Sequence, residues 1–167
     1  IKIAENVAKK LKLKSKVTVF KNFGTAMFKY KNFEIEFVGT RKESYSKNSR
    51  NPQVSPGSLK DDLNRRDYTI NTIGISLNKN SWGEVIDEFN GIDDLKNKVI
   101  RTPLEPKKTF SDDPLRMLRG ARFASQLNFK IDKKSFDGLI SEKDRIKIVS
   151  PERISEEINK IINTEKP

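Results

Sequence analysis

Cysteine and histidine are both absent from this chain of 167 residues. Without cysteine, the chain cannot form disulfides, thiolate nucleophiles or Cys-ligated metal sites. Without histidine, it cannot carry Ser-His or Cys-His catalytic pairs or the HExxH zinc motif. No run approaches the roughly 18 apolar residues of a membrane span, and we expect no signal peptide. Any chemistry therefore depends on Asp, Glu, Lys, Arg, Ser, Thr or Tyr, or on a hard cation bound by oxygen atoms.

Positive charge is abundant, with 34 Lys and Arg against 23 Asp and Glu, a formal net charge of +11. Such a balance favours nucleic acid, nucleotides or an anionic membrane surface as a partner. The alternative is a lysine-rich surface that only keeps the protein in solution. The length suits one ordinary domain, or one domain with a helical extension.

The first half of the chain shows helix and strand patterns in turn. Residues 1–11 predict an amphipathic helix that has no N-cap and no initiating Met, so we expect a piece of a longer protein. Residues 33–38 alternate apolar and acidic side chains, which places Glu34 and Glu36 together on one strand face. Lys31-Asn32 suits a two-residue hairpin turn. Further strands are predicted at residues 17–20, 26–30, 75–77, 84–87 and 99–101, with a turn at 78–80 and a short helix or turn at 92–97.

Residues 41–62 are polar, with few apolar side chains, and predict a long loop. The next segment, 59–75, begins with a helical pattern, and its part from 68 to 75 is ambiguous between helix and strand. After about residue 105 the strand signals stop. Helices are predicted at 114–127, capped by Asp113 with Pro114 at its first position, at 133–141, and at 151–163 behind Ser150.

Four charged side chains recur every three residues along the helix predicted from Pro114. Asp113, Arg116, Arg119 and Arg122 form a row that winds slowly around this helix, because each step turns by about −60°. The simple interpretation is a helix cap followed by a solvated face. The neighbouring leucines and alanines instead favour a half-buried polar face. Arginine, unlike lysine, offers a planar set of donors to a phosphate or a base edge.

Two other charged groups are candidates. Arg65, Arg66 and Asp67 follow the polar loop, either as a surface cluster or at the mouth of a site. Glu34 and Glu36 either face solvent or supply one ligand of Mg²⁺, which binds one or two carboxylates together with substrate phosphates. The sequence offers no partner ligand at suitable local spacing.

Taken in order, seven segments resemble one family: the class II tRNA nucleotidyltransferases, or CCA-adding enzymes, and their bacterial poly(A) polymerase relatives. The similarity runs from about residue 20 to residue 160. The segments are Phe23-Gly24-Thr25-Ala26, Ile35-Glu36-Phe37, RRDYTIN at 65–71, IDEFNGIDDL at 86–95, Ile100-Arg101, DDPLRMLRGARFA at 112–124 and SPERI at 150–154. The resemblance implies an α+β fold. An incomplete nucleotidyltransferase palm, a mixed β-sheet with helices, would cover residues 1–105, and an all-helical neck with the base-recognition region would cover residues 106–167.

The resemblance also implies roles for individual residues. Asp113 and Arg116 would read the base edge of CTP or ATP, and Arg119, Arg122 and Arg66 would be further nucleotide-binding residues. Other positions would support this site: Asp67 at the ribose, Arg65 and Asp112 beside the binding residues, and Glu152 and Arg153 as a brace for the base-reading helix. Residues 42–58 would form a mobile loop beside the active site.

One departure from the family is large, because its Gly-Gly and Asp-x-Asp motifs are absent from this chain. In the family, the Asp pair holds the two Mg²⁺ ions that activate the RNA 3′-hydroxyl and clamp the triphosphate. Glu36 occupies the position of a possible third carboxylate and metal ligand. We therefore expect an enzyme as the parent protein, and a chain that is inactive alone.

The implied activity is addition of CMP and AMP to the acceptor end of tRNA in the cytoplasm, without a membrane partner. CC-only addition, A-only addition and poly(A) synthesis remain open, as does the oligomeric state. A non-catalytic RNA-binding module is the alternative from another class. A basic ribosome-associated protein would not explain the ordered motifs.

Overall fold

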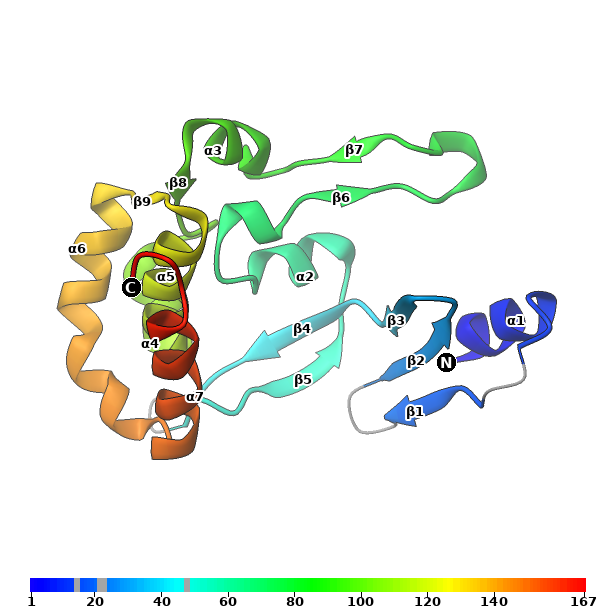
Figure 1. Ribbon diagram of the computed structural model, residues 1–167, viewed down its shortest axis with the longest axis horizontal. Helices are drawn as coiled ribbons and strands as arrows, with labels where there is room; N and C mark the ends of the chain where they lie inside the picture. Colours follow the sequence, from blue (N-terminus) through cyan, green and yellow to red (C-terminus); the bar gives the residue numbers. More distant parts are fainter. Residues whose placement is uncertain (14–15, 21–23, 47–48) are drawn as a thin grey trace. The chain divides into compact units, whose positions relative to one another are not determined.

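The computed structural model describes residues 1–13, 16–20, 24–46 and 49–167, and it divides into two compact units, residues 1–41 and 42–167 (Figure 1). Phe23, which belongs to the first of the family-like segments, lies outside the described residues, as do positions 47 and 48 of the expected mobile loop. Among the described residues, no helix is long and apolar enough to cross a membrane.

The first unit packs helix α1 (Lys2–Lys10) against an antiparallel sheet of β1 (Thr18–Phe20), β2 (Thr25–Tyr30) and β3 (Phe33–Val38), in the order β1-β2-β3. The predicted two-residue turn is confirmed, because Tyr30 pairs with Phe33 across it. Lys31 in this turn has a φ of 54°, in the left-handed region that such turns require.

The two faces of β3 differ as its alternating sequence predicts. Ile35 and Phe37 are half-buried, and the Phe37 ring centroid lies 5.5 Å from that of the buried Phe28. Phe33 departs from the pattern, since it is 68% exposed next to the hairpin turn. Glu36 is exposed on the other face.

The second unit begins with a correction, because the loop expected at 41–62 is partly ordered into regular elements. It contains β4 (Arg41–Ser44) and β5 (Gln53–Pro56), which pair and run in opposite directions in Figure 1, and helix α2 (Leu59–Asn64). The side chains of β5 are all exposed. Its sequence therefore lacks the alternation of apolar and polar residues by which a half-buried strand is predicted. A capping box formed by Ser58 and Asp61 starts α2.

The ambiguous segment resolves into a 3₁₀ turn and a strand. These are η2 (Thr69–Asn71) and β6 (Gly74–Ile75), which pairs antiparallel with β7 (Val85–Ile86). The expected turn between these strands contains a second 3₁₀ turn, η3 (Lys79–Ser81). Helix α3 (Gly91–Asn97) and strand β8 (Val99–Ile100) follow as predicted.

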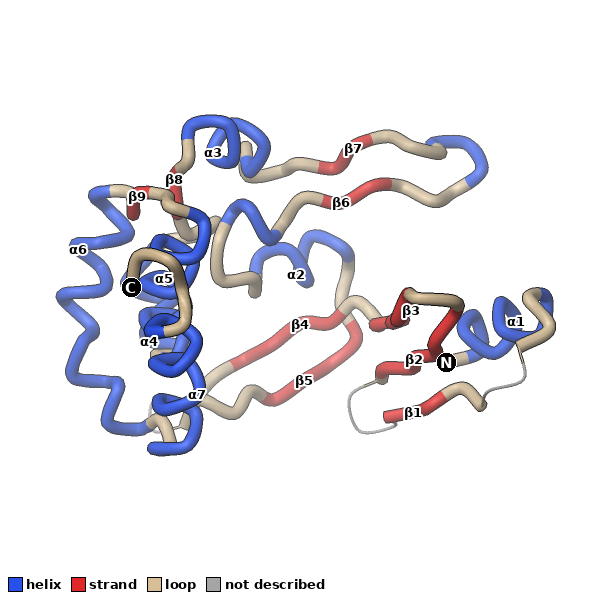
Figure 2. Tube along the Cα trace, viewed as in Figure 1, coloured by secondary structure: helices blue, strands red, loops and turns tan. Residues whose placement is uncertain are grey.

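The later part of the chain is mostly helical, as Figure 2 shows. It contains α5 (Leu115–Leu127), α6 (Lys133–Glu142) and α7 (Pro151–Ile162), close to the predicted helices. Three elements were not predicted: helix α4 (Pro106–Asp112), strand β9 (Lys130–Ile131) and the 3₁₀ turn η4 (Lys143–Ile148). Because β9 pairs in parallel with β8, the expectation that strands end before residue 105 is wrong by this one short strand.

The core of the second unit draws on both sides of residue 105. Tyr68, Ile100, Phe110 and Met117 form its buried cluster. Helix α4 packs on α6, and α5 packs on α7. The division into a head and a neck at residue 105 therefore stays a prediction, and the two parts share one core.

Candidate functional site

Arg116 lies at the centre of the candidate site and is only 7% exposed. Its Nη1 donates to the carbonyl oxygen of Thr109 at 3.2 Å, and its Nη2 donates to that of Arg65 at 2.8 Å. Nη2 also donates to the hydroxyl of Tyr45 at 3.3 Å. The predicted half-buried polar face is therefore real, and this guanidinium is held by two backbone carbonyls and the Tyr45 hydroxyl.

Asp113 is engaged by an arginine that the sequence did not single out. Nε of Arg50 donates to Oδ1 at 2.9 Å, and Nη2 donates to Oδ2 at 3.2 Å, which is a two-point contact. Asp113 ends α4 in extended conformation, and its Oδ1 also accepts from the backbone of Leu115 at 3.2 Å. It thus supports the start of α5, but Pro114 occupies the cap position, one residue later than predicted.

Asp67 and Arg119 came from separate motifs, and the structure brings them together. Nε of Arg119 donates to Asp67 Oδ2 at 2.6 Å, while Oδ1 accepts from the side chain of Asn71 at 2.8 Å. Phe123 supports the arginine, with its ring centroid 5.4 Å from the guanidinium carbon. The carboxylate is 7% exposed and fully engaged within the protein.

Arg65 and Arg66 both bind Asp62. This buried carboxylate was not among the predicted site residues. The nitrogen-to-oxygen distances are 2.6 Å for Arg65 and 2.9 Å for Arg66. Burial alone would raise the pKa of Asp62, but the hydrogen bonds from the two arginines outweigh burial and lower it. The carboxylate therefore stays charged and anchors both arginines. The Nε of Arg66 is buried without a partner among the described residues.

These side chains surround a depression of about 440 Å³. Six arginines and two aspartates line it, so its charge balance suits an anionic ligand. Its lining is Arg50, Arg65, Arg66, Asp67, Asn71, Asp113, Leu115, Arg116, Arg119, Phe123 and Arg153.

A second depression, of about 360 Å³, shares Arg65 and Arg116 with the first and is also lined by Asp112, Glu43 and Tyr45. Burial raises the pKa of Asp112, against the opposing attraction of Arg116 and Lys108. The predicted supporting acid thus lies beside Arg116 but faces a different hollow.

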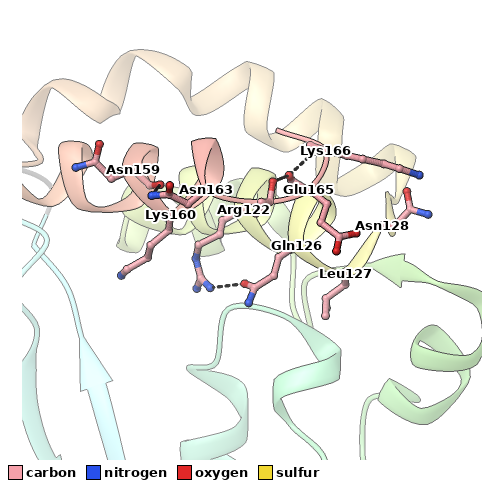
Figure 3. Close-up of a pocket in the computed structure, with 11 residues that line it drawn as sticks. Arg122, Gln126, Leu127, Asn128, Asn159, Lys160, Asn163, Glu165 and Lys166 are labelled. Carbon is pink, nitrogen blue, oxygen red and sulfur yellow. Dashed lines mark hydrogen bonds between the residues drawn. The ribbon is translucent and has the colours of Figure 1, made fainter.

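Arg122 lies apart from the other predicted nucleotide-binding residues. Its Nε donates to Glu157 of α7 at 2.7 Å, and its Nη1 donates to Gln126 at 3.0 Å. Figure 3 shows Arg122 and Gln126 at a third depression, of about 760 Å³, where the C-terminal parts of α5 and α7 meet. The nucleotide role of Arg122 stays a prediction, and its contacts here join two helices.

Glu152 and Arg153, the predicted brace of the base-reading helix, differ in their surroundings. Arg153 lines the 440 Å³ depression and pairs with Glu156 at 3.0 Å. Glu152 is exposed, and hydrogen bonds at the start of α7, from its own backbone and from Ser150, lower its pKa. Glu157, which the sequence analysis missed, is the carboxylate that connects α7 to α5.

Acidic side chains in the described part of the chain are possible ligands of Mg²⁺. Among residues 1–13, 16–20, 24–46 and 49–167, no three acidic side chains converge in a way that could hold a metal ion. Glu36 is exposed on β3, as is Glu34, and its role as a metal ligand stays a prediction.

Comparison with known proteins gives the family. Residues 2–101 match the family described as "Poly A polymerase head domain", and residues 128–167 match "Probable RNA and SrmB- binding site of polymerase A". The first match covers more than half of the chain. The chain therefore belongs to the poly A polymerase head domain family, which confirms the resemblance found in the sequence.

Two curated relatives are enzymes of tRNA 3′-end synthesis by name. The "A-adding tRNA nucleotidyltransferase" of Aquifex aeolicus is 46% identical over 134 residues, covering 79% of this chain and 16% of the relative. The "CCA-adding enzyme" of Lactobacillus helveticus is 38% identical over 140 residues, covering 83% and 34%. The chain thus spans 16% and 34% of these relatives' lengths.

Solved structures confirm the predicted α+β fold class. A structure described as "tRNA-processing enzyme with CTP" has a TM-score of 0.83 and 35% identity, and the match covers 99% of this chain and 42% of that one. A tRNA nucleotidyltransferase "complexed with a primer tRNA and an incoming ATP analog" has a TM-score of 0.78 and 36% identity, with 95% and 43% covered.

Proposed function

We propose that this chain is the nucleotide-selecting part of an RNA 3′-terminal nucleotidyltransferase that adds CMP and AMP to tRNA. The observation that carries the proposal is the convergence of Asp113 and Arg116 with Arg66, Asp67 and Arg119 around one depression. The named relatives support it, and so do the similar solved structures with CTP and with a primer tRNA and an ATP analog.

The chemistry of the pair explains which bases would fit. Cytosine and adenine each present an amino donor beside a ring-nitrogen acceptor. A carboxylate accepts from the first, and a guanidinium donates to the second. Uracil and guanine present the reverse pattern, which would leave both Asp113 and Arg116 mismatched. Because Arg50 now holds Asp113 at 2.9 Å, a bound base would replace Arg50 as its partner.

Binding of the four nucleoside triphosphates to this chain tests base selection directly. Titration calorimetry is expected to show CTP and ATP bound about tenfold or more tightly than UTP and GTP, since a mismatched buried hydrogen-bonding pair costs about 1–3 kcal/mol. Asp113→Asn is expected to weaken this preference, because the amide replaces one acceptor with a donor. Asp144→Asn, at an exposed position outside the depression, is the matched control. Equal binding of all four nucleotides would contradict the proposal.

The activity itself is tested on the full-length gene product with a tRNA transcript that ends before CCA. Addition of two C residues with CTP, and of one A only after ATP is supplied, would establish CCA addition, for which Mg²⁺ is the proposed cofactor. Addition of a single A would indicate an A-adding enzyme, and a ladder of A residues a poly(A) polymerase. RNA that is bound but not extended would support a non-catalytic binding module. The cytoplasm stays the predicted location.

A further inference from the structure

The guanidinium of Arg116 is also held from the 360 Å³ depression, by residues that do not line the proposed nucleotide site. Tyr45 follows β4 directly, and Glu43 lies within β4. Both line the 360 Å³ depression and neither lines the 440 Å³ one, whereas Arg116 lines both. Arg65 lines both depressions as well, so any effect of Tyr45 and Glu43 on a bound nucleotide would pass through Arg116 or Arg65.

The Tyr45 hydroxyl acts both as a hydrogen-bond donor and as an acceptor. It donates its hydrogen to Glu43 Oε2 at 2.6 Å and accepts from Arg116 Nη2 at 3.3 Å. Its ring also lies near the guanidinium, with 5.8 Å between the Arg116 Cζ and the ring centroid. Since the hydrogen points at Glu43, a lone pair is left facing Arg116, which fixes the direction of the contact.

Glu43 closes the network. Its side chain is only 3% exposed and lies 3.5 Å from Nη1 of Arg65. The carbonyl of the same Arg65 accepts from Arg116 at 2.8 Å. The contacts thus run from Glu43 through Tyr45 and Arg116 to Arg65, and back to Glu43. Burial first, and then Glu43, raise the pKa of Tyr45, so the hydroxyl remains a donor at all ordinary pH values.

We propose that Tyr45 and Glu43 are positioning residues that orient the Arg116 guanidinium and thereby sharpen discrimination between nucleobases. This inference rests on the proposed function. A base edge is read correctly only if the planar donor group keeps a fixed orientation. The backbone carbonyls of Thr109 and Arg65 hold two of its nitrogens, and Tyr45 is the side chain that restricts the remaining rotation.

Tyr45→Phe tests the inference, because it removes one oxygen and leaves the ring in place. Tyr30→Phe, in the first unit, is the matched control. The first measurement is the ¹⁵N guanidinium spectrum, with the Arg116 signals assigned by their loss in Arg116→Lys. We expect resolved Arg116 hydrogens in the original chain and exchange-broadened ones in Tyr45→Phe. The second measurement is the ratio of CTP to UTP affinity, which should fall about fivefold, the loss expected for one hydrogen bond.

Glu43→Gln is the conservative companion variant, since an amide oxygen still accepts from Tyr45. It should change the spectrum and the ratio less than Tyr45→Phe does, and it decides the question if Tyr45→Phe unfolds. Unchanged Arg116 signals and an unchanged ratio in both variants would overturn the inference. If the original chain binds none of the four nucleotides, the proposed function and the discrimination role both fail. The spectra then still decide whether Tyr45 positions Arg116.

Discussion

At the scale of single residues, the site depends on the difference between arginine and lysine. Arg116 donates from two nitrogens to three acceptors, two of which are backbone carbonyls. A lysine has one nitrogen, so it cannot reach all of these positions at once. The buried carbonyls left without a donor would then cost free energy.

Arg116→Lys is therefore expected to lower the free energy of unfolding by about 1–3 kcal/mol. The measurement is urea unfolding followed by circular dichroism. Arg153→Lys is the control, because Arg153 is half exposed and pairs only with Glu156 among the described residues. Equal free energies of unfolding for the two variants would show that the guanidinium hydrogen bonds of Arg116 do not stabilise the fold.

Asp112 provides a pH-dependent test. Burial raises its pKa above the ordinary value of 3.8. The folded state therefore disfavours the charged form, and this penalty is present at pH 7 and disappears as the pH falls below 3.8. Asp112→Asn should be more stable than the original chain at pH 7 and equal to it at low pH. Asp144→Asn, at an exposed position, should show no such gain. A loss of stability at pH 7 would mean that attraction to Arg116 and Lys108 dominates.

At the scale of elements, the start of α5 is fixed by one aromatic side chain. The Tyr68 hydroxyl donates to the carbonyl of Arg116 at 2.6 Å. Gly120 leaves the space for this contact, since a Cβ there would lie 2.2 Å from the hydroxyl oxygen. Gly120, inside the DDPLRMLRGARFA segment, is thus required because Tyr68, the residue before η2, packs against α5.

Gly120→Ala is accordingly expected to destabilise the chain by about 1–3 kcal/mol, the usual cost of overpacking. The change should also weaken nucleotide binding, because Tyr68 and Arg116 would shift together. Thermal unfolding and CTP titration measure the two effects. Gly74→Ala is the control, since its new Cβ would meet only Ile86, at 3.9 Å. A stable variant that binds CTP normally would contradict this account.

The contact between α5 and α7 depends on Glu157. Burial alone would raise its pKa, but the hydrogen bonds from Lys160 and Arg122 outweigh burial and lower it. The stabilisation is therefore present above the ordinary value of 4.5 and is lost as the pH falls through the lowered value. Glu157→Gln should cost about 1–3 kcal/mol at pH 7 and nothing at pH values where the original carboxylate is protonated. Urea unfolding across this pH range measures the effect, and Glu156→Gln is the control. A loss of unfolding free energy that does not depend on pH would show that the contact is not ionic.

The elements that the sequence predicted well share one property, a strong apolar period. Strand β3 and helices α5, α6 and α7 have it. Strands β4 and β5 have no such period, because β4 consists of polar and charged residues and the side chains of β5 are all exposed. Helix α4 had a usable signal in Glu105-Pro106, a cap and first position.

The candidate site divides in the same way. The helix row and the Arg-Arg-Asp segment were visible as motifs. Arg50 and Tyr45 were not, because they contact Asp113 and Arg116 across 63 and 71 residues of chain, and no local pattern encodes such a contact. Glu157 did leave a trace, since a carboxylate that follows Ile154 by three residues interrupts the apolar stripe of α7.

At the scale of the whole molecule, positive charge is distributed unevenly. Residues 1–41 contain ten Lys and Arg but three Asp and Glu, whereas residues 42–105 contain ten of each. Four described lysines of the second unit pair with a carboxylate: Lys96, Lys133, Lys147 and Lys160. In the described part of the first unit the excess of positive charge is larger, which favours exchange of counterions for RNA phosphates there.

Replacing Lys9, Lys10 and Lys12 with alanine is expected to weaken tRNA binding and flatten its salt dependence. If all three contact phosphates, the slope of log affinity against log salt should fall by about 2 to 3. Fluorescence anisotropy with a labelled tRNA transcript, from about 50 to 200 mM KCl, measures this slope. The matched control replaces Lys96, Lys133 and Lys147, each of which pairs with an aspartate. The two triple variants lose the same formal charge. Equal slopes would mean that only net charge matters, and a smaller slope for the first variant alone would assign the RNA contact to the first unit.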